Sequence, residues 1–246
     1  SWLYERGAGS FEEMSDLPKA LRARLARHTV LGHLNIRTEQ QSQDGTIKRL
    51  YRLHDGQLIE AVLMPYADGR RTACISSQAG CAMGCVFCAT GQMGFSRHLS
   101  AAEIFSQAAV YSRELQSRGE RLSNVVLMGM GEPFHNYDAV VAALRRMMSD
   151  LGIGARHLTV STVGLVPQIR RFAQEGMQVT LAISLHASTD EERSALLPVN
   201  KRWPLAELMD ACSEYVERTG RRITFEWALI AGENDTIEVA ARLGVL

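Results

Sequence analysis

The sequence predicts an α/β fold, an incomplete (βα) TIM-like barrel with a small N-terminal helical and β extension. With 246 residues, 46% of them hydrophobic, the chain is long enough for one α/β domain and a small appendage. After residue 70, short apolar runs rich in β-formers alternate with helical stretches, which is typical of repeated βα units. The run Val125–Met128 is continuously apolar, as expected for parallel strands that are covered on both faces.

The N-terminal part predicts a helix followed by a β-meander. The helical pattern covers residues 11–27, where Leu17, Leu21 and Leu25 are four residues apart. Asp-Gly turns separate three expected strands, at 47–53, 58–64 and 72–77. We therefore expect three regions: a remnant of a helical domain over 1–45, a β-meander extension over 46–70, and the barrel core, lacking its C-terminal part, over 71–246.

The barrel core predicts five βα units. We expect strands at 71–77, 124–128, 157–162, 178–185 and 222–230. We expect helices at 101–117, 137–149, 166–175 and 205–219. Five units are fewer than a closed eight-stranded barrel needs, so the predicted sheet stays open. The first residue is not Met, and residues 237–246 stop inside a further helical pattern, so we interpret the sequence as a possible fragment.

Composition excludes some classes of protein. Lys and Arg balance Asp and Glu at 27 each, so an RNA contact would have to come from local basic patches. No apolar run approaches the roughly 18 to 20 residues of a membrane span, and we expect a cytoplasmic monomer that does not contact membranes. Four of the five cysteines fall within fifteen residues, which in a cytosolic chain indicates metal or redox chemistry rather than a disulfide framework.

Cys81, Cys85 and Cys88 have the spacing C-x3-C-x2-C and directly follow an expected strand. Iron–sulfur clusters usually take four cysteine ligands, so three thiolates would leave one iron of a cubane open. An open iron can chelate the amino and carboxylate groups of S-adenosylmethionine (SAM), whose radical chemistry the protein then orients. A structural zinc site is the alternative, with His98 or Cys74 as fourth ligand, but the usual second cysteine pair is absent.

Polar residues also follow the expected barrel strands. The glycine-rich segment Gly129–Pro133 follows one strand, Ser161 ends the next, and Ser184–His186 end the one after. Taken singly, such a segment is more often a plain turn, and a lone histidine is more often structural. Because TIM-like barrels hold their chemistry at the carboxyl ends of the strands, the recurrence favours one site. Glu132 there is suited to the amino group of SAM.

These motifs, with an aromatic residue (Phe87) before the last cysteine, resemble the radical SAM superfamily, and in particular the RlmN/Cfr group of RNA adenosine methyltransferases. Segments Trp2–Tyr4 and Ser10–Met14 are similar to the end of that group's N-terminal helical domain. The resemblance covers nearly the whole chain in order, through the segments Arg71–Cys81, Cys88–Phe95, Gly129–Pro133, Val160–Gly164, Ser184–Ala187, Leu197–Lys201 and Gly232–Asp235.

The resemblance implies a role for each candidate residue. The ligands of a 4Fe–4S cluster would be Cys81, Cys85 and Cys88. The contacts to SAM would be Gly131, Glu132, Ser161, Ser184, Leu185 and His186. Cys74 would help to resolve a covalent link between enzyme and RNA, ending in a disulfide, and Glu60 would be a proton acceptor. Without the resemblance, Cys74 is a small buried residue on a strand and Glu60 a solvated strand residue.

The implied activity is methylation of C2 of an adenosine in 23S rRNA and tRNA, with two SAM molecules and an electron donor such as flavodoxin and flavodoxin reductase. The alternatives are a Cfr-like methylation of C8, or a protein that binds SAM and the cluster without methyltransferase activity. The family also uses a methyl-accepting cysteine near its C-terminus. No cysteine follows Cys212, which we assign to packing, so we expect the chain as given to cleave SAM but not to methylate RNA.

Overall fold

The computed structural model describes residues 2, 8, 10–29 and 34–245. Most of its strands form one sheet, and in that sheet the neighbours from β4 through β10 are parallel, whereas β1 to β4 are antiparallel. In spatial order the eight strands are β1 (Asn35–Gln41), β2 (Ile47–Arg52), β3 (Leu58–Pro65), β4 (Arg71–Cys74), β7 (Asn124–Leu127), β8 (Leu158–Thr162), β9 (Thr180–Ser184) and β10 (Ile223–Glu226). The predicted fold class, an open and incomplete α/β barrel, is confirmed.

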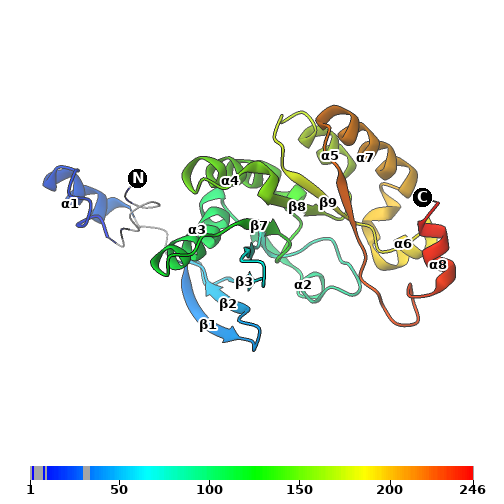
Figure 1. The fold of residues 1–246 in the computed structure, drawn as a ribbon, viewed down its shortest axis with the longest axis horizontal. Helices are drawn as coiled ribbons and strands as arrows, with labels where there is room; N and C mark the ends of the chain where they lie inside the picture. Colours follow the sequence, from blue (N-terminus) through cyan, green and yellow to red (C-terminus); the bar gives the residue numbers. More distant parts are fainter. Residues whose placement is uncertain (1, 3–7, 9, 30–33, 246) are drawn as a thin grey trace.

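Helices connect the parallel strands. The main ones are α3 (Ala101–Ser117), α4 (Tyr137–Asp150), α5 (Val166–Phe172), α6 (Asp190–Leu196), α7 (Leu205–Thr219) and α8 (Ile237–Leu243). The shorter or outlying elements are α1 (Lys19–His28), α2 (Ala89–Gln92), η1 (Pro133–Asn136), η2 (Ala155–His157), η3 (Pro198–Lys201) and a small second sheet of β5 (Gln78–Gly80) with β6 (Phe95–His98). Figure 1 shows α7 and α8 toward one end of the molecule, α1 apart from the sheet at the other end, and β1 to β3 at the lower edge between them.

Alternation along the strands divides the sheet into two faces. On β3, Ile59, Ala61 and Leu63 are buried against the helices, whereas Glu60 and Val62 point to the other face. Helix α3 supplies much of that apolar contact, and it begins with a capping box in which Ser100 and Glu103 satisfy each other's backbone amides. The helix-facing side is therefore the core, and the opposite, inner face is free to carry polar groups.

After Ile75, whose amide and carbonyl still bond Val126 and Gly129, the chain leaves the sheet before β5, and side-chain amides bond its backbone. Gln107 of α3 accepts a hydrogen bond from the Ser76 amide (2.8 Å) and donates one to the Ser76 carbonyl (2.9 Å). Asn136 of η1 donates to the carbonyls of Ser77 (2.8 Å) and Leu99 (2.7 Å). These buried contacts fix the path of the chain into the cysteine loop.

Some predicted bounds were wrong, for local reasons. The first helix begins at Lys19 rather than at residue 11, because Pro18 precedes it and the residues before Pro18 form turns. Strand β4 ends at Cys74, since the chain turns away to form β5. Strand β10 ends at Glu226, because the side chain of Asn234 bonds the Ile230 amide and the Ala228 carbonyl and closes a loop.

Strand β1 and helix α6 were not predicted, and neither were the short elements α2, β5, β6, η1 and η3. Strand β1 falls in the range 1–45, where we expected only helix; it is exposed along its whole length and has no apolar alternation to reveal it. Helix α6 is a single short segment, capped by Thr189. The motif residues Leu3 and Tyr4 lie outside the described residues.

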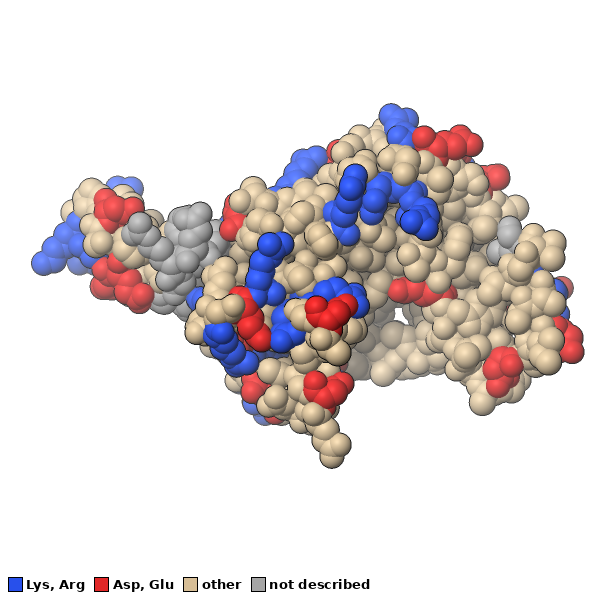
Figure 2. Space-filling view, in the orientation of Figure 1, with Lys and Arg blue, Asp and Glu red and all other residues tan. Residues whose placement is uncertain are grey.

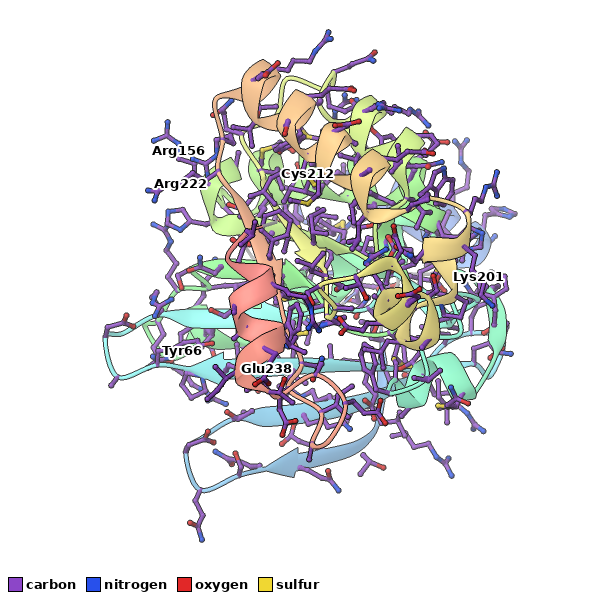
Figure 3. All side chains as sticks on the ribbon, turned by 90° about the vertical axis from the view of Figure 1, so that its right-hand side faces the viewer. Tyr66, Arg156, Lys201, Cys212, Arg222 and Glu238 are labelled. Atoms are coloured by element: carbon purple, nitrogen blue, oxygen red, sulfur yellow. The ribbon has the colours of Figure 1, made fainter. Side chains whose placement is uncertain are left out.

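The view of Figure 3 separates the two ends of the barrel. Arg156 and Arg222 lie at the margin where the strands begin, Lys201 lies at the opposite margin, and Cys212 lies among packed side chains. All five cysteines are free thiols. None of the helices in the described part of the chain is both long enough and apolar enough to cross a membrane.

Candidate functional site

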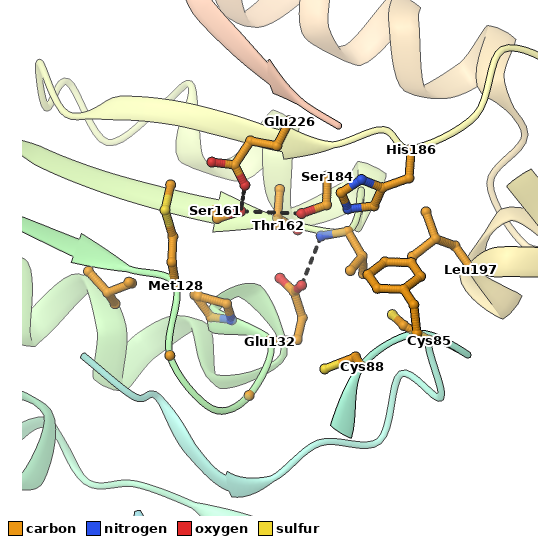
Figure 4. Close-up of a pocket in the computed structure, with 16 residues that line it drawn as sticks. Cys85, Cys88, Met128, Glu132, Ser161, Thr162, Ser184, His186, Leu197 and Glu226 are labelled. Atoms are coloured by element: carbon orange, nitrogen blue, oxygen red, sulfur yellow. Dashed lines mark hydrogen bonds between the residues drawn. The ribbon is translucent and has the colours of Figure 1, made fainter. Parts of the chain in front are cut away.

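The carboxyl ends of the parallel strands and the cysteine loop surround a cavity of about 230 Å³, which we call the rim cavity (Figure 4). Many of the residues predicted to share a site line it together: Cys85, Cys88, Gly131, Glu132, Ser161, Ser184 and His186. Cys81 and Leu185 are buried outside its lining. Glu60 and Cys74 do not line it either.

The turn Gly129–Gly131 leads from β7 into the rim cavity. A Cβ atom on Gly131, whose φ is +99°, would lie 2.5 Å from the Cβ of Gln78, and a Cβ on Gly129 would lie 2.8 Å from the Ile75 backbone. The turn is held by hydrogen bonds to the same segment, such as that from the Met130 amide to Ser76 Oγ (2.8 Å). The glycines are thus required by close packing on the chain after β4, and not only by a ligand.

Glu132 follows this turn and is buried, 3% exposed. Its Oε1 accepts a hydrogen bond from the Phe134 amide, and its Oε2 one from the Val163 amide, both at 2.9 Å. Burial raises the pKa of Glu132 to about 7, although the two amides favour the charged form. The carboxyl group is therefore held in place and buried, and near neutral pH it is close to its pKa. A cation bound beside it would favour the ionised form, so the position suits the binding of a cation.

His186 follows β9 in the left-handed region, with φ +59°. Its Nδ1 accepts a hydrogen bond from the Ala228 amide (3.0 Å), and burial lowers the pKa of His186 to about 4. The ring is thus neutral at neutral pH, and its proton is on Nε2, which can donate to a ligand. Phe87 of the cysteine loop packs edge-on against this ring.

The two predicted serines meet a carboxylate that we did not predict. Ser161 Oγ donates to Glu226 Oε2 (3.1 Å) and lies 3.4 Å from Ser184 Oγ (Figure 4). Glu226 is the last residue of β10 and lines the rim cavity. The strand-end rule would have identified it, but we expected this strand to continue to Ile230, which placed Glu226 in its interior.

The cysteine loop presents three thiols near the rim cavity. The amide of Cys81 donates to the Gly94 carbonyl (2.9 Å), and the amide of Val86 donates to the Leu196 carbonyl (3.1 Å), so both arms of the loop are anchored. Burial, and then the neighbouring Cys81 and Cys88, raise the pKa of Cys85 to about 12. Such thiols become thiolates when a metal site replaces their protons. This soft donor set fits an iron–sulfur cluster.

The residues suggested as a fourth zinc ligand lie elsewhere. His98 Nδ1 is 2.9 Å from Gln78 Nε2, and the His98 ring packs against His135. Cys74 sits at the end of β4 between Val62 and Val126. Among the described residues, no three His, Cys, Asp or Glu side chains converge on a single-ion site.

Glu60 and Cys74 lie on the inner face of the sheet. Val62 is the cross-strand partner of Cys74, and Glu60 is two residues away on the same face of β3. Glu60 Oε1 is 2.7 Å from Lys48 Nζ, and its side chain is 40% exposed. Burial, and more weakly the charge of Glu226, raise the pKa of the half-buried Cys74 to about 11.

Comparison with known proteins places these features in a family context. Residues 75–243 match the model of the radical SAM superfamily, and residues 1–31 match that of the ribosomal RNA large subunit methyltransferase N-terminal domain. The fold is similar to the crystal structure of a radical SAM methyltransferase from Sphaerobacter thermophilus, with a TM-score of 0.95 and 49% sequence identity. The superposition covers 99% of this chain and 72% of that one.

Two curated relatives show the same similarity in sequence. The chain is 56% identical to dual-specificity RNA methyltransferase RlmN 1 of Myxococcus xanthus, across 99% of the chain and 68% of the relative. It is 50% identical to a probable dual-specificity RNA methyltransferase RlmN of Halalkalibacterium halodurans, across 100% of the chain and 68% of the relative. The chain thus spans about two thirds of the length of these relatives.

Proposed function

Because the chain belongs to the RlmN family of radical SAM methyltransferases, we propose that it methylates C2 of an adenosine in 23S rRNA and in tRNA, using two SAM molecules and a 4Fe–4S cluster. The observation that carries this proposal is the rim cavity. Two of the loop cysteines and the strand-end residues Glu132, Ser161, Ser184 and His186 line it together, although they are up to about a hundred residues apart in the chain.

In this proposal, Cys81, Cys85 and Cys88 hold the cluster. When bound, such a cluster supplies the electron that cleaves SAM, and the protein supplies binding and orientation. The loop is anchored at Gly94 and Leu196, which keeps Cys85 and Cys88 in the lining of the rim cavity and Cys81 buried behind them. Phe87 covers part of the same region and limits the access of water.

The proposed SAM contacts divide by chemistry. Glu132 binds the ammonium group, whose positive charge favours the ionised carboxylate. The Nε2–H of His186 donates a hydrogen bond, and the hydroxyls of Ser161 and Ser184 bind polar groups of the ligand. Gly131 and Leu185 complete the set; Gly131 gives backbone contact at the turn, and Leu185 stands between the Ser184 and His186 contacts.

Glu60 and Cys74 are the proposed catalytic residues on the inner face of the sheet. Glu60 is the proton acceptor, and it lies in an ion pair with Lys48. Cys74 would attack the sulfur of the family's methyl-accepting cysteine while that sulfur is bonded to the RNA-linked carbon. The S–S bond forms as the C–S bond breaks, and the electron pair stays on the carbon, which takes up a proton. The raised pKa of Cys74 means that the thiol, not the thiolate, is the resting form, so deprotonation must accompany the attack.

RNA is the proposed macromolecular partner, and a flavodoxin with its reductase is the proposed electron source. Local basic patches would carry the RNA contact, since the total charge is balanced. On the face that it displays, Figure 2 shows a group of Lys and Arg side chains over the region where Figure 1 places α5, β8 and β9.

The decisive experiment compares nucleosides from 23S rRNA and tRNA of cells that carry the gene and of cells that lack it. Mass spectrometry should show 2-methyladenosine only when the gene is present. Loss of 8-methyladenosine instead would establish the Cfr-like alternative. Unchanged RNA in both strains would contradict methyltransferase activity and would favour a protein that only binds SAM and the cluster.

A further inference from the structure

Arg193 of α6 is a fully buried arginine whose hydrogen bonds all go to neutral oxygens. Its guanidinium donates to the carbonyls of Val163 (2.6 Å), Ser184 (3.2 Å) and Leu185 (3.2 Å), and to Asn200 Oδ1 (2.9 Å). The first three acceptors lie at the carboxyl ends of β8 and β9. Arg193 therefore sits directly behind the wall of the rim cavity.

In the part of the chain that the structure describes, Arg193 has no direct negative partner. Among the described residues, no carboxylate lies within ion-pair distance of its guanidinium; the nearest acidic group bonded to the network is Asp190, reached through Asn200. Arg49, another buried arginine, differs sharply, since it contacts Glu39 at 2.6 Å and Glu114 at 2.7 Å. Burying an uncompensated charge is costly. Burial lowers the pKa of Arg193 to about 10, so the group stays charged at neutral pH.

The anionic groups that could compensate this charge are the thiolates of the cysteine loop. Helix α6 and the loop are joined by the hydrogen bond from the Val86 amide to the Leu196 carbonyl. Cys85 shares a buried cluster with Leu196 and Leu197, at the end of α6. The negative groups that act on the Arg193 charge are, in decreasing order, Asp190, Cys85 of the cysteine loop and Cys212; of these only Cys85 belongs to the proposed cluster ligands.

We propose that Arg193 is the buried counter-charge of the cysteine-held cluster and raises its reduction potential. This inference rests on the proposed cluster. It gives a role to a residue that belongs neither to the cysteine loop nor to the strand ends nor to the proposed SAM contacts. Three thiolates around an iron–sulfur cluster leave net negative charge, and each added electron increases it. A fixed positive charge in a buried region stabilises the reduced form more than the oxidised form. Arg193 is thus a positioning and tuning residue that touches neither SAM nor RNA.

The test uses Arg193→Gln, Arg193→Lys and the control Arg49→Gln in anaerobically reconstituted protein. The measurements are iron content and a spectroscopic redox titration of the cluster. Arg193→Gln should shift the potential to more negative values, whereas Arg193→Lys, which keeps the charge but not the planar set of donors, should stay near wild type. Arg49→Gln should leave the potential unchanged even though it removes a buried arginine.

Each alternative outcome has a distinct meaning. Equal shifts in Arg193→Gln and Arg193→Lys would assign the effect to hydrogen bonding and would overturn the counter-charge. An unshifted, fully loaded Arg193→Gln would also overturn it. Loss of the cluster in Arg193→Gln alone would support the counter-charge. Loss in both Arg193 variants would overturn it, because Arg193 would then act only through its hydrogen bonds to the protein. Failure of the wild-type protein to bind iron would instead refute the proposed function.

Discussion

Phe87 stands edge-on to His186, with ring centroids 4.9 Å apart and planes at 79°. The first residue belongs to the cysteine loop and the second follows β9, so a single aromatic contact joins the proposed cluster ligands to the proposed SAM contacts. Edge-to-face aromatic pairs contribute about 0.5 to 1.5 kcal/mol beyond the burial of their surface. The contact holds the loop against the wall of the rim cavity.

Phe87→Ala is expected to loosen this contact and expose the loop to water. The cluster of the reconstituted protein should then decay faster in air. Its visible absorbance, recorded over time, measures this decay. Val86→Ala is the matched control, since Val86 is on the same loop and 53% exposed, with its anchor to Leu196 made by the backbone. Equal decay rates in the two variants would show that the ring contact does not protect the site.

Glu132→Ala is expected to weaken SAM binding by about 1.5 to 3 kcal/mol, the range for a hydrogen bond to a charged group. The cluster spectrum should stay intact, because Glu132 is not a cysteine-loop residue. Isothermal titration of reconstituted protein measures the affinity. Glu60→Ala, outside the rim cavity, serves as the control and should bind SAM normally. Unchanged affinity in Glu132→Ala would remove this residue from the ligand contacts.

Glu132→Gln is expected to change how stability depends on pH. The pKa of Glu132 rises from 4.5 to about 7 on folding, so the folded state holds the proton more tightly. The protonated Glu132 carboxyl therefore stabilises the folded state fully below pH 4.5, and this stabilisation is lost as pH rises through about 7. The free energy of unfolding falls by about 3 kcal/mol over this range. Relative to wild type, the Gln variant should therefore gain stability between about pH 5 and about pH 8, measured by urea unfolding.

The control for this comparison is Glu207→Gln, which changes an exposed glutamate of α7. Its stability should follow the wild-type curve across the same pH range. Parallel curves for Glu132→Gln and wild type would show that the Glu132 carboxyl is ionised at low cost, contrary to its burial.

Gly131→Ala is expected to destabilise the protein more than Gly152→Ala. Both glycines have positive φ, +99° and +64°, so both variants carry the strain of a side chain in this region. Only at Gly131 does the new Cβ meet atoms, at 2.5 Å from Gln78; nothing lies within 4 Å at Gly152. We expect about 1 to 2 kcal/mol for Gly152→Ala and at least about 1 kcal/mol more for Gly131→Ala. Equal free energies of unfolding would mean that Gln78 moves aside freely.

Cys85→Ala is expected to abolish cluster binding. Wild-type protein reconstituted without oxygen should contain about four irons per chain, the number in a cubane. Cys212→Ala, a buried position of α7 outside the loop, should keep its iron and lose only packing energy. Stoichiometric zinc in the purified protein, with iron never entering, would contradict the cluster assignment.

The predictable parts of the fold have strong local signals. Helix α3 begins and ends where the sequence predicted it. Its start is fixed by a capping box between Ser100, which precedes the helix, and Glu103 in its first turn. Helix α7 also has its predicted bounds, because Gly220 adopts the left-handed conformation that ends it. The rim residues were predictable for a similar reason, since parallel strands bring their carboxyl ends to one edge.

The parts that were missed depend on tertiary contacts. Strand β1 exists because it pairs with β2, and its polar, exposed residues contain no pattern that predicts pairing. Arg193 lies in a charged stretch that resembles a solvated helix surface, and only the folded chain buries it. Glu226 was hidden by a wrong strand end. In each case the element or side chain is fixed by its partners in the fold, and no local pattern of hydrophobic residues reveals it.

The amides of Gln107 and Asn136 limit how far the cysteine loop can be moved to other proteins. Ser76 and Ser77 are buried, and their carbonyls have these two side chains as hydrogen-bond partners. A designer who moves this segment to another parallel sheet without Gln107 and Asn136 would leave the buried Ser76 carbonyl unpaired, at about 1 to 3 kcal/mol, and the Ser77 carbonyl with only its bond from the Leu99 amide. The transferable unit is therefore the loop together with one amide from the following helix and one from the turn after the next strand.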